Sequence, residues 1–256
     1  MFNYEEYKNI ISLIRDHLPI IDFSDVSDET EKFCVLRHDI EFSVDRAYEL
    51  AKVEKEIGVE STYTVQLRNN TYNALSEKNI DLVKKIKDLG HHIGLHQNPP
   101  LMELKDLGGY IEADLKVLEH YYGFKVDRYA FHRPKKQYLA SNIKMDPIIN
   151  CYDKKFFHFY EDNPLSLVLR DLDMKQISKL NVLYLSDSNH KWKFGYPMNF
   201  DFSKIDKLQL LTHPYSWTKD GGDNYTNFLS LIRERNKELL HSMNTETSTF
   251  PKELLQ

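Results

Sequence analysis

Short apolar runs alternate with amphipathic segments along most of this chain. Apolar residues that recur every three or four positions are typical of helices with one buried face. Five such helices are predicted, over residues 3–18, 43–57, 76–89, 111–122 and 227–243. Runs rich in β-branched and aromatic residues predict strands between them. Seven strands are predicted, over residues 33–39, 61–67, 92–96, 126–132, 148–152, 181–185 and 208–212. This alternation predicts right-handed βαβ units, and therefore an α/β fold with a parallel sheet.

The same pattern indicates a single domain over residues 1–243, followed by a polar tail over residues 244–256. A chain of 256 residues is a usual length for one α/β barrel. No internal repeat or linker interrupts the pattern. The least regular part is residues 153–180, where irregular or antiparallel additions are expected.

Composition narrows the class of protein. Hydrophobic residues make up 41% of the chain, which is enough to bury a sizeable core. The net charge is −5 and no basic block is present, which argues against nucleic acid as a partner. Cys34 and Cys151 lie in apolar or aromatic surroundings and are expected to be buried free thiols in a reducing compartment. The first residues have neither a basic region nor a long apolar run, so we expect no signal peptide, no membrane span and a cytoplasmic location.

Histidine or aspartate follows five of the predicted strands at their carboxyl ends. The five corners are His38-Asp39-Ile40-Glu41, His96-Gln97-Asn98, His132-Arg133-Pro134, Ser186-Asp187-Ser188 and His213-Pro214. In a parallel α/β fold, the carboxyl ends of all strands lie on one face, where active sites form. These five segments are therefore expected to converge.

Strand geometry sorts these candidates. Asp39 and Glu41 are two residues apart, so they face the same side, about 6.6 Å apart along a strand, and His38 faces the other way. His92 and His96 would be about 13 Å apart on a strand, so they cannot bind one ion together. His92, or its neighbour His91, is better interpreted as a packing or hydrogen-bonding residue.

The chain resembles the polysaccharide deacetylases of the NodB-homology type, carbohydrate esterase family 4, and most of all their WbmS-like branch. The segments on which the resemblance depends are residues 36–43, 61–68, 90–96, 131–134, 184–188 and 211–214. Their order and spacing extend over residues 33 to 217, which is most of the chain.

This resemblance implies a distorted (β/α)7 barrel with a divalent metal, often zinc, at the carboxyl ends of the strands. It implies that Asp39 is the catalytic base and that Glu41 and His96 are metal ligands. It also implies that His213 is the catalytic acid. Arg133 resembles the arginine that orients the base, and Asp187 resembles a residue that orients a neighbour in the site.

The sequence departs from the family pattern at the second metal histidine, where Pro100 stands and cannot bind a metal. His132 ends the neighbouring strand and could supply the missing imidazole. A second register, in which Asp39 is a ligand and His38 takes the position of the base, stays open. Structural roles compete too, because Glu41 could cap the following helix. His96 and His132 could be ordinary strand-end histidines.

The function implied is metal-dependent hydrolysis of an N-acetyl or O-acetyl group of an activated or lipid-linked sugar during surface-polysaccharide biosynthesis. One alternative is a degenerate deacetylase-like protein that binds a glycan intermediate or a partner enzyme without hydrolysis. A metal-dependent hydrolase of another C–N bond is a third. Four aromatic residues are candidates for stacking on a sugar ring or for core packing, namely Trp192, Phe194, Tyr215 and Trp217.

Overall fold

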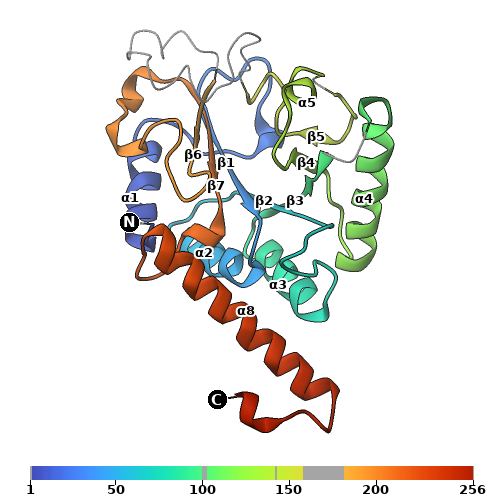
Figure 1. Cartoon of the computed structure of the whole chain (residues 1–256). Helices are drawn as coiled ribbons and strands as arrows, with labels where there is room; N and C mark the ends of the chain where they lie inside the picture. Colours follow the sequence, from blue (N-terminus) through green and yellow to red (C-terminus); the bar gives the residue numbers. More distant parts are fainter. Residues whose placement is uncertain (1, 100–102, 142, 158–181, 256) are drawn as a thin grey trace.

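Seven parallel strands form one curled sheet in the computed structural model, which describes residues 2–99, 103–141, 143–157 and 182–255 (Figure 1). The strands are β1 (Phe33–Ile40), β2 (Thr62–Val65), β3 (His92–Gln97), β4 (Arg128–Phe131), β5 (Ile149–Asn150), β6 (Leu183–Ser186) and β7 (Lys207–Thr212). Their order across the sheet is β5-β4-β3-β2-β1-β7-β6, and every neighbouring pair is parallel. The predicted α/β class and distorted (β/α)7 barrel are confirmed.

Helices lie around this sheet (Figure 1). They are α1 (Tyr4–Arg15), α2 (Val44–Glu56), α3 (Glu77–Asp88), α4 (Leu107–Tyr122), α5 (Lys136–Ser141) and α8 (Asn224–Glu246). The side chains of Asn3, Ser43 and Ser76 cap the first three of these, each accepting a hydrogen bond from a backbone N–H in the first turn. Gly123 ends α4 in the left-handed conformation that glycine adopts without strain.

The helix boundaries differ from the predicted ones at three places. Helix α4 begins at Leu107 rather than at residue 111, because Gly108 and Gly109 are poor helix formers and hide its first turn in the sequence. The short α5 lies in a segment where no helix was predicted. Helix α8 continues to Glu246, so the predicted boundary after residue 243 falls within it. Most of residues 153–180 lies outside the described residues.

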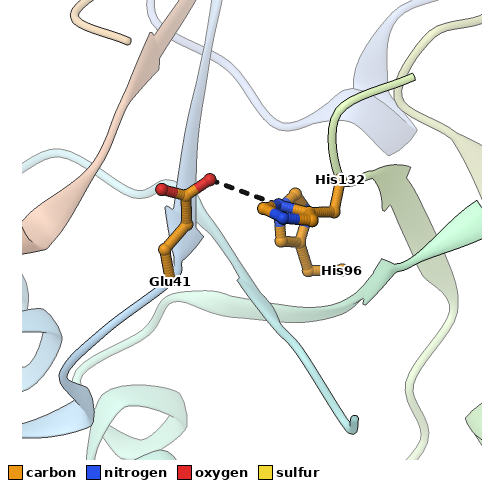
Figure 2. A group of neighbouring side chains, drawn as sticks. All are labelled: Glu41, His96 and His132. Atoms are coloured by element: carbon orange, nitrogen blue, oxygen red, sulfur yellow. Dashed lines mark hydrogen bonds and ion pairs between the residues drawn. The ribbon is translucent and has the colours of Figure 1, made fainter. Parts of the chain in front are cut away.

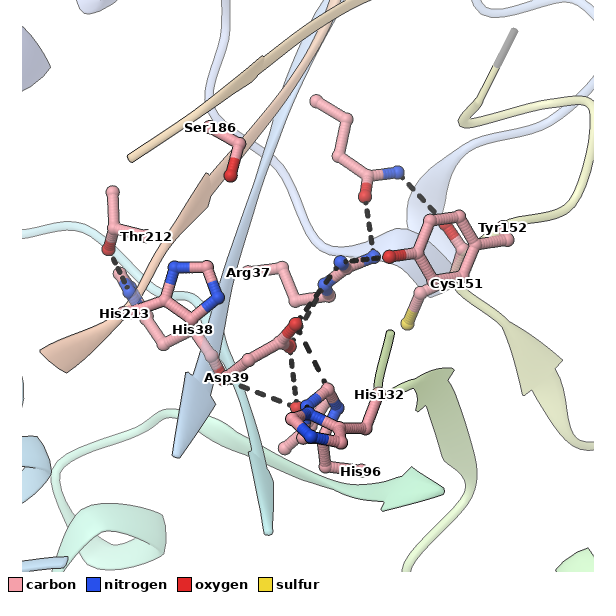
Figure 3. Close-up of polar contacts among 12 residues, drawn as sticks. Arg37, His38, Asp39, His96, His132, Cys151, Tyr152, Ser186, Thr212 and His213 are labelled. Atoms are coloured by element: carbon pink, nitrogen blue, oxygen red, sulfur yellow. Dashed lines mark hydrogen bonds and ion pairs between the residues drawn. The ribbon is translucent and has the colours of Figure 1, made fainter. Parts of the chain in front are cut away.

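Strand β1 is at the centre of the sheet between β2 and β7, and all eight of its residues are buried. Its side chains alternate between two sides. On the outer side, His38 contacts Glu54 of α2 through its Nε2 atom at 2.9 Å and Thr212 of β7 through Nδ1 at 2.6 Å. Arg37 and Asp39 point to the inner side of the curled sheet, where the site lies (Figure 3).

Glu54 is completely buried behind β1 and has a full set of partners. Besides His38, it accepts hydrogen bonds from three hydroxyls, those of Tyr7 at 2.5 Å, Ser61 at 2.6 Å and Tyr63 at 2.8 Å. His91 lies 3.6 Å from the same carboxylate and contacts the carbonyl of Ala51. This cluster joins α1, α2, β1 and β2, and it places His38 and His91 in structural roles. The register that made His38 a base is therefore wrong.

Close packing between β3 and β4 explains why residue 94 is a glycine. Gly94 of β3 has no room for a side chain, because a Cβ atom there would lie 2.9 Å from Cγ of Arg128 and 3.2 Å from its backbone oxygen. Both cysteines are buried and free. Among the helices that the structure describes, none is long and apolar enough to cross a membrane.

Candidate active site and metal centre

Three predicted metal ligands come together at the carboxyl ends of β1, β3 and β4 (Figure 2). Glu41 follows β1, His96 belongs to β3, and His132 follows β4. Nε2 of His96 lies 3.1 Å from Nδ1 of His132, and this atom lies 3.2 Å from Oε1 of Glu41. The three ligand atoms all lie within 4.8 Å of one another. Glu41 thus belongs to this cluster, and the residue that caps α2 is Ser43 rather than Glu41.

These spacings suit a divalent cation. Ligands about 2.0–2.1 Å from a tetrahedral ion are separated by about 3.3 Å, and two of the three separations here are 3.1 and 3.2 Å. Two imidazoles and one carboxylate form a donor set typical of zinc and related transition metals, whereas magnesium and calcium prefer oxygen alone.

The second nitrogen of His96 provides an independent test of this fit. Its Nδ1 atom is buried without a hydrogen-bond partner among the described residues and lies 3.8 Å from Oδ2 of Asp39. Metal-bound histidines usually direct the other ring nitrogen at a carboxylate in this way. Burial, only partly opposed by Asp39, lowers the pKa of His96 to about 4, so the imidazole is neutral and able to bind a metal at neutral pH. The residues present therefore fit a bound metal.

Asp39 is held by an arginine of its own strand (Figure 3). Nε of Arg37 donates to Oδ1 of Asp39 at 3.1 Å, and the hydroxyl of Thr64 donates to the same oxygen at 2.7 Å. Arg37 also donates to Gln209 and to the hydroxyl of Tyr152, each at 2.8 Å. Burial would raise the pKa of Asp39, but Arg37, together with the nearby His96, His213 and Thr64, outweighs it and holds this pKa well below its usual range. Asp39 is therefore ionised and fixed in orientation.

Arg133 does not orient Asp39 as the resemblance implied. Among the described residues the two make no contact, and the carboxylate is occupied by Arg37 and Thr64. Arg133 follows β4 with a φ of 46° and is exposed, so the left-handed turn takes it away from the buried carboxylate.

His213 and Asp187 form a second pair beside the metal cluster. Nδ1 of His213 lies 2.6 Å from Oδ1 of Asp187, whose other oxygen accepts a hydrogen bond from the indole of Trp217 at 2.8 Å. The other ring nitrogen, Nε2, lies 3.8 Å from Oε1 of Glu41. Burial favours the neutral ring, but Asp187 and then Glu41 outweigh it and raise the pKa of His213 to about 9. The pair thus presents a protonated imidazole to the cluster.

A cavity of about 540 Å³ opens over these groups. Asp39, Glu41, His96 and His213 line it together with aromatic and cationic side chains. These further lining residues include Phe131, Arg133, Tyr152, Phe157, Tyr184, Lys193 and Phe194. Of the four aromatic candidates for sugar stacking, Phe194 lines the cavity, whereas Trp217 is fully buried in the core.

Arg37 and Asp39 could be recognised from the sequence as a charge pair, because residues two apart on a strand share a side. Sequence reasoning missed the residues that hold this arginine. Gln209 and Tyr152 could not be found in this way, since they lie 172 and 115 positions from Arg37. The departure at Pro100 lies outside the described residues.

No family model and no curated protein matches this sequence. Several solved structures are similar at 11% identity. A pseudoenzyme of carbohydrate esterase family 4 from Bacillus anthracis matches with a TM-score of 0.39, over 86% of this chain and 68% of that one. A chitin deacetylase from Colletotrichum lindemuthianum matches with a TM-score of 0.40, over 85% and 86%. A family 4 acetyl xylan esterase from Clostridium thermocellum, in complex with a cobalt ion, matches with a TM-score of 0.40, over 79% and 84%. Function is therefore inferred from the side chains of the site.

Proposed function

We propose that this protein is a metal-dependent carbohydrate deacetylase of the NodB-homology type, WbmS-like branch. Its reaction would be hydrolysis of an N-acetyl or O-acetyl group of a sugar intermediate in surface-polysaccharide biosynthesis. The observation that supports this most strongly is the convergence of Glu41, His96 and His132 between an ionised Asp39 and a protonated His213. Two buried free thiols agree with a reducing compartment and hence a cytoplasmic location.

Asp39 is the proton acceptor in this proposal. Arg37 and Thr64 hold its carboxylate on the pocket side of β1, so it needs no rearrangement to receive the proton of an attacking water. The same contacts lower its basicity, and proton transfer to it therefore needs water that is more acidic than bulk water.

Glu41, His96 and His132 would hold the metal, for which zinc suits the donors best. A divalent cation bound there would polarise the acyl carbonyl and increase the acidity of a neighbouring water. The greater acidity of this water offsets the low basicity of Asp39.

His213 is the proton donor. Its Nδ1–H donates to Asp187, so Nε2–H points toward Glu41 and the cavity. When the C–N bond breaks, His213 gives its Nε2 proton to the departing amine and becomes neutral. Asp187 orients the ring and keeps the charged form stable until that step.

Metal content and acetate release test the proposal together. The purified protein should contain a stoichiometric divalent metal, or take it up from zinc, cobalt or nickel, and should release acetate from N-acetylated or O-acetylated sugars. His96→Ala and His132→Ala should each lower metal affinity strongly. His92→Ala is the matched control, because His92 belongs to β3 but lies near Asp22, away from the cluster.

Three results would contradict this assignment in whole or in part. A protein that takes up none of the three metals contradicts the whole mechanism. Unchanged metal affinity in His132→Ala contradicts His132 as a ligand. A metal-loaded protein that binds sugars and releases no acetate would favour the alternative, a glycan-binding protein without hydrolytic activity.

A further inference from the structure

We propose that the site is built for an anionic N-acyl sugar, with a phosphate group bound by Arg133 within the cavity. The position of the acyl group rests on the proposed function. The binding of phosphate by Arg133 rests on the charges of the cavity and can be tested without any hydrolysis.

Each acidic residue that lines the cavity has a partner within the site, whereas Arg133 has none among the described residues. Asp39 is paired with Arg37, and Glu41 faces His132. Arg133 lines the same cavity but makes no hydrogen bond or ion pair with any residue that the structure describes. An exposed guanidinium that has no partner in the described part of the chain can bind an added anion.

A second cation lines the cavity from another loop. Lys193 follows β6, and its ammonium lies 5.6 Å from the ring centroid of Phe194, which also lines the cavity. Arg133 follows β4, so the two cations come from separate loops that border one space. This arrangement occurs in a chain whose net charge is −5, so it does not reflect a generally basic surface.

The backbone at Arg133 supports a binding role. Its φ of 46° is uncommon for a residue other than glycine, and such strain persists mainly where side-chain placement matters for function. A guanidinium offers paired N–H donors that match two oxygens of a phosphate or carboxylate. Cations from two loops favour phosphate, because its oxygens project in more than one plane.

The cavity has room for such a ligand. Its volume of about 540 Å³ lies within the range of about 300–1,000 Å³ that is usual for small-molecule sites. Aromatic residues, among them Phe131 and Tyr184, line the same cavity as the metal cluster and the cations, and they suit the faces of a sugar ring.

Calorimetry with three sugars tests this inference. The probes are N-acetylglucosamine, its 1-phosphate, and N-acetylmuramic acid, whose negative charge is a carboxylate on a lactyl group at O3 rather than a phosphate at C1. Glucose and glucose 1-phosphate repeat the comparison without an acyl group. We expect the phosphates to bind at least about tenfold more tightly than the neutral sugars, as one charge-assisted contact implies. Inorganic phosphate should compete.

Substitutions of single cations show which side chains cause the preference for phosphate. Arg133→Ala should remove most of the preference for phosphate, and Arg133→Lys should restore part of it, because lysine keeps the charge but not the paired donors. Lys193→Ala should reduce the preference. Lys135→Ala is the matched control, since Lys135 is an exposed cation two residues from Arg133 that does not line the cavity. It should leave the preference unchanged.

Equal affinity for neutral and phosphorylated sugars would overturn the inference. So would an equal loss of preference in Arg133→Ala and Lys135→Ala, which would indicate only a general electrostatic field. A preference for the carboxylate sugar would overturn the choice of phosphate. Failure of the deacetylase assignment is distinguishable, because acetate release would then be absent while the glucose 1-phosphate preference still depended on Arg133.

Discussion

Replacing Arg37 with methionine tests whether this arginine, rather than Arg133, compensates the charge of Asp39. Methionine fills a similar volume but leaves the carboxylate without a cation. Arg37 is 0% exposed and Asp39 is 2% exposed, so the carboxylate left without its cation would be largely shielded from bulk water. Among the residues that the structure describes, only the hydroxyl of Thr64 would remain as a hydrogen-bond donor to Asp39, at 2.7 Å.

The expected cost is about 3–5 kcal/mol in the free energy of unfolding, the usual result of breaking a buried ion pair by removing one partner. The lost contacts to Gln209 and Tyr152 act in the same direction. For a domain of this size, about 2–4 °C of melting temperature is lost per kcal/mol, so the melting temperature should fall by roughly 6–20 °C.

A double-mutant cycle separates charge from packing. Asp39→Asn removes the charge, so the variant with both substitutions should recover at least about 2 kcal/mol relative to the sum of the single variants. Guanidinium unfolding followed by circular dichroism gives all four values. Arg133→Met is the matched control and should change stability by no more than about 0.5 kcal/mol, as is usual for an exposed side chain.

Additive effects of the two substitutions would refute the reasoning. Coupling below about 0.5 kcal/mol would mean that the Arg37–Asp39 contact does not compensate a buried charge. A larger loss of stability in Arg133→Met than in Arg37→Met would return the orienting role to Arg133.

Three further predictions concern other parts of the molecule. Burial raises the pKa of Glu54 but His38 outweighs it and lowers this pKa to about 2, so the group contributes stability above pH 4.5 that is lost as the pH falls toward 2. Glu54→Gln should remove about 2 kcal/mol of the stability that is otherwise lost between pH 7 and pH 3, measured by unfolding at both pH values; an unchanged pH dependence would contradict it. Asp187→Asn should lower kcat by about 10²–10⁴-fold with little change in KM, because a neutral amide no longer stabilises the protonated ring of His213 or fixes its orientation as the carboxylate does; a wild-type kcat in steady-state assays would exclude this role. Gly94→Ala should lower the free energy of unfolding by about 1–3 kcal/mol, because the new Cβ meets Arg128. Gly108→Ala on α4 should not destabilise the protein, because a Cβ there meets open space. Thermal melting distinguishes the two variants.

The strand ends account for most of what could be predicted about the site. Parallel strands all end at one edge of a sheet, so residues as distant as Glu41, His96 and His132 had to meet there once the strands were recognised. Side chains alternate between the two faces of a strand, which predicted that His38 and Asp39 face opposite sides. The structure places them on opposite sides of β1.

The sequence by itself thus determined the α/β class, the parallel sheet and the set of side chains that share its active edge, because these follow from local periodicity and strand direction. Only the tertiary structure decided which of these side chains are partners. Arg37 rather than Arg133 holds Asp39, because curling of the sheet brings Tyr152 and Gln209 to the Arg37 guanidinium while a left-handed turn leaves Arg133 exposed. Such pairings depend on distances between elements far apart in the chain, and no local pattern encodes them.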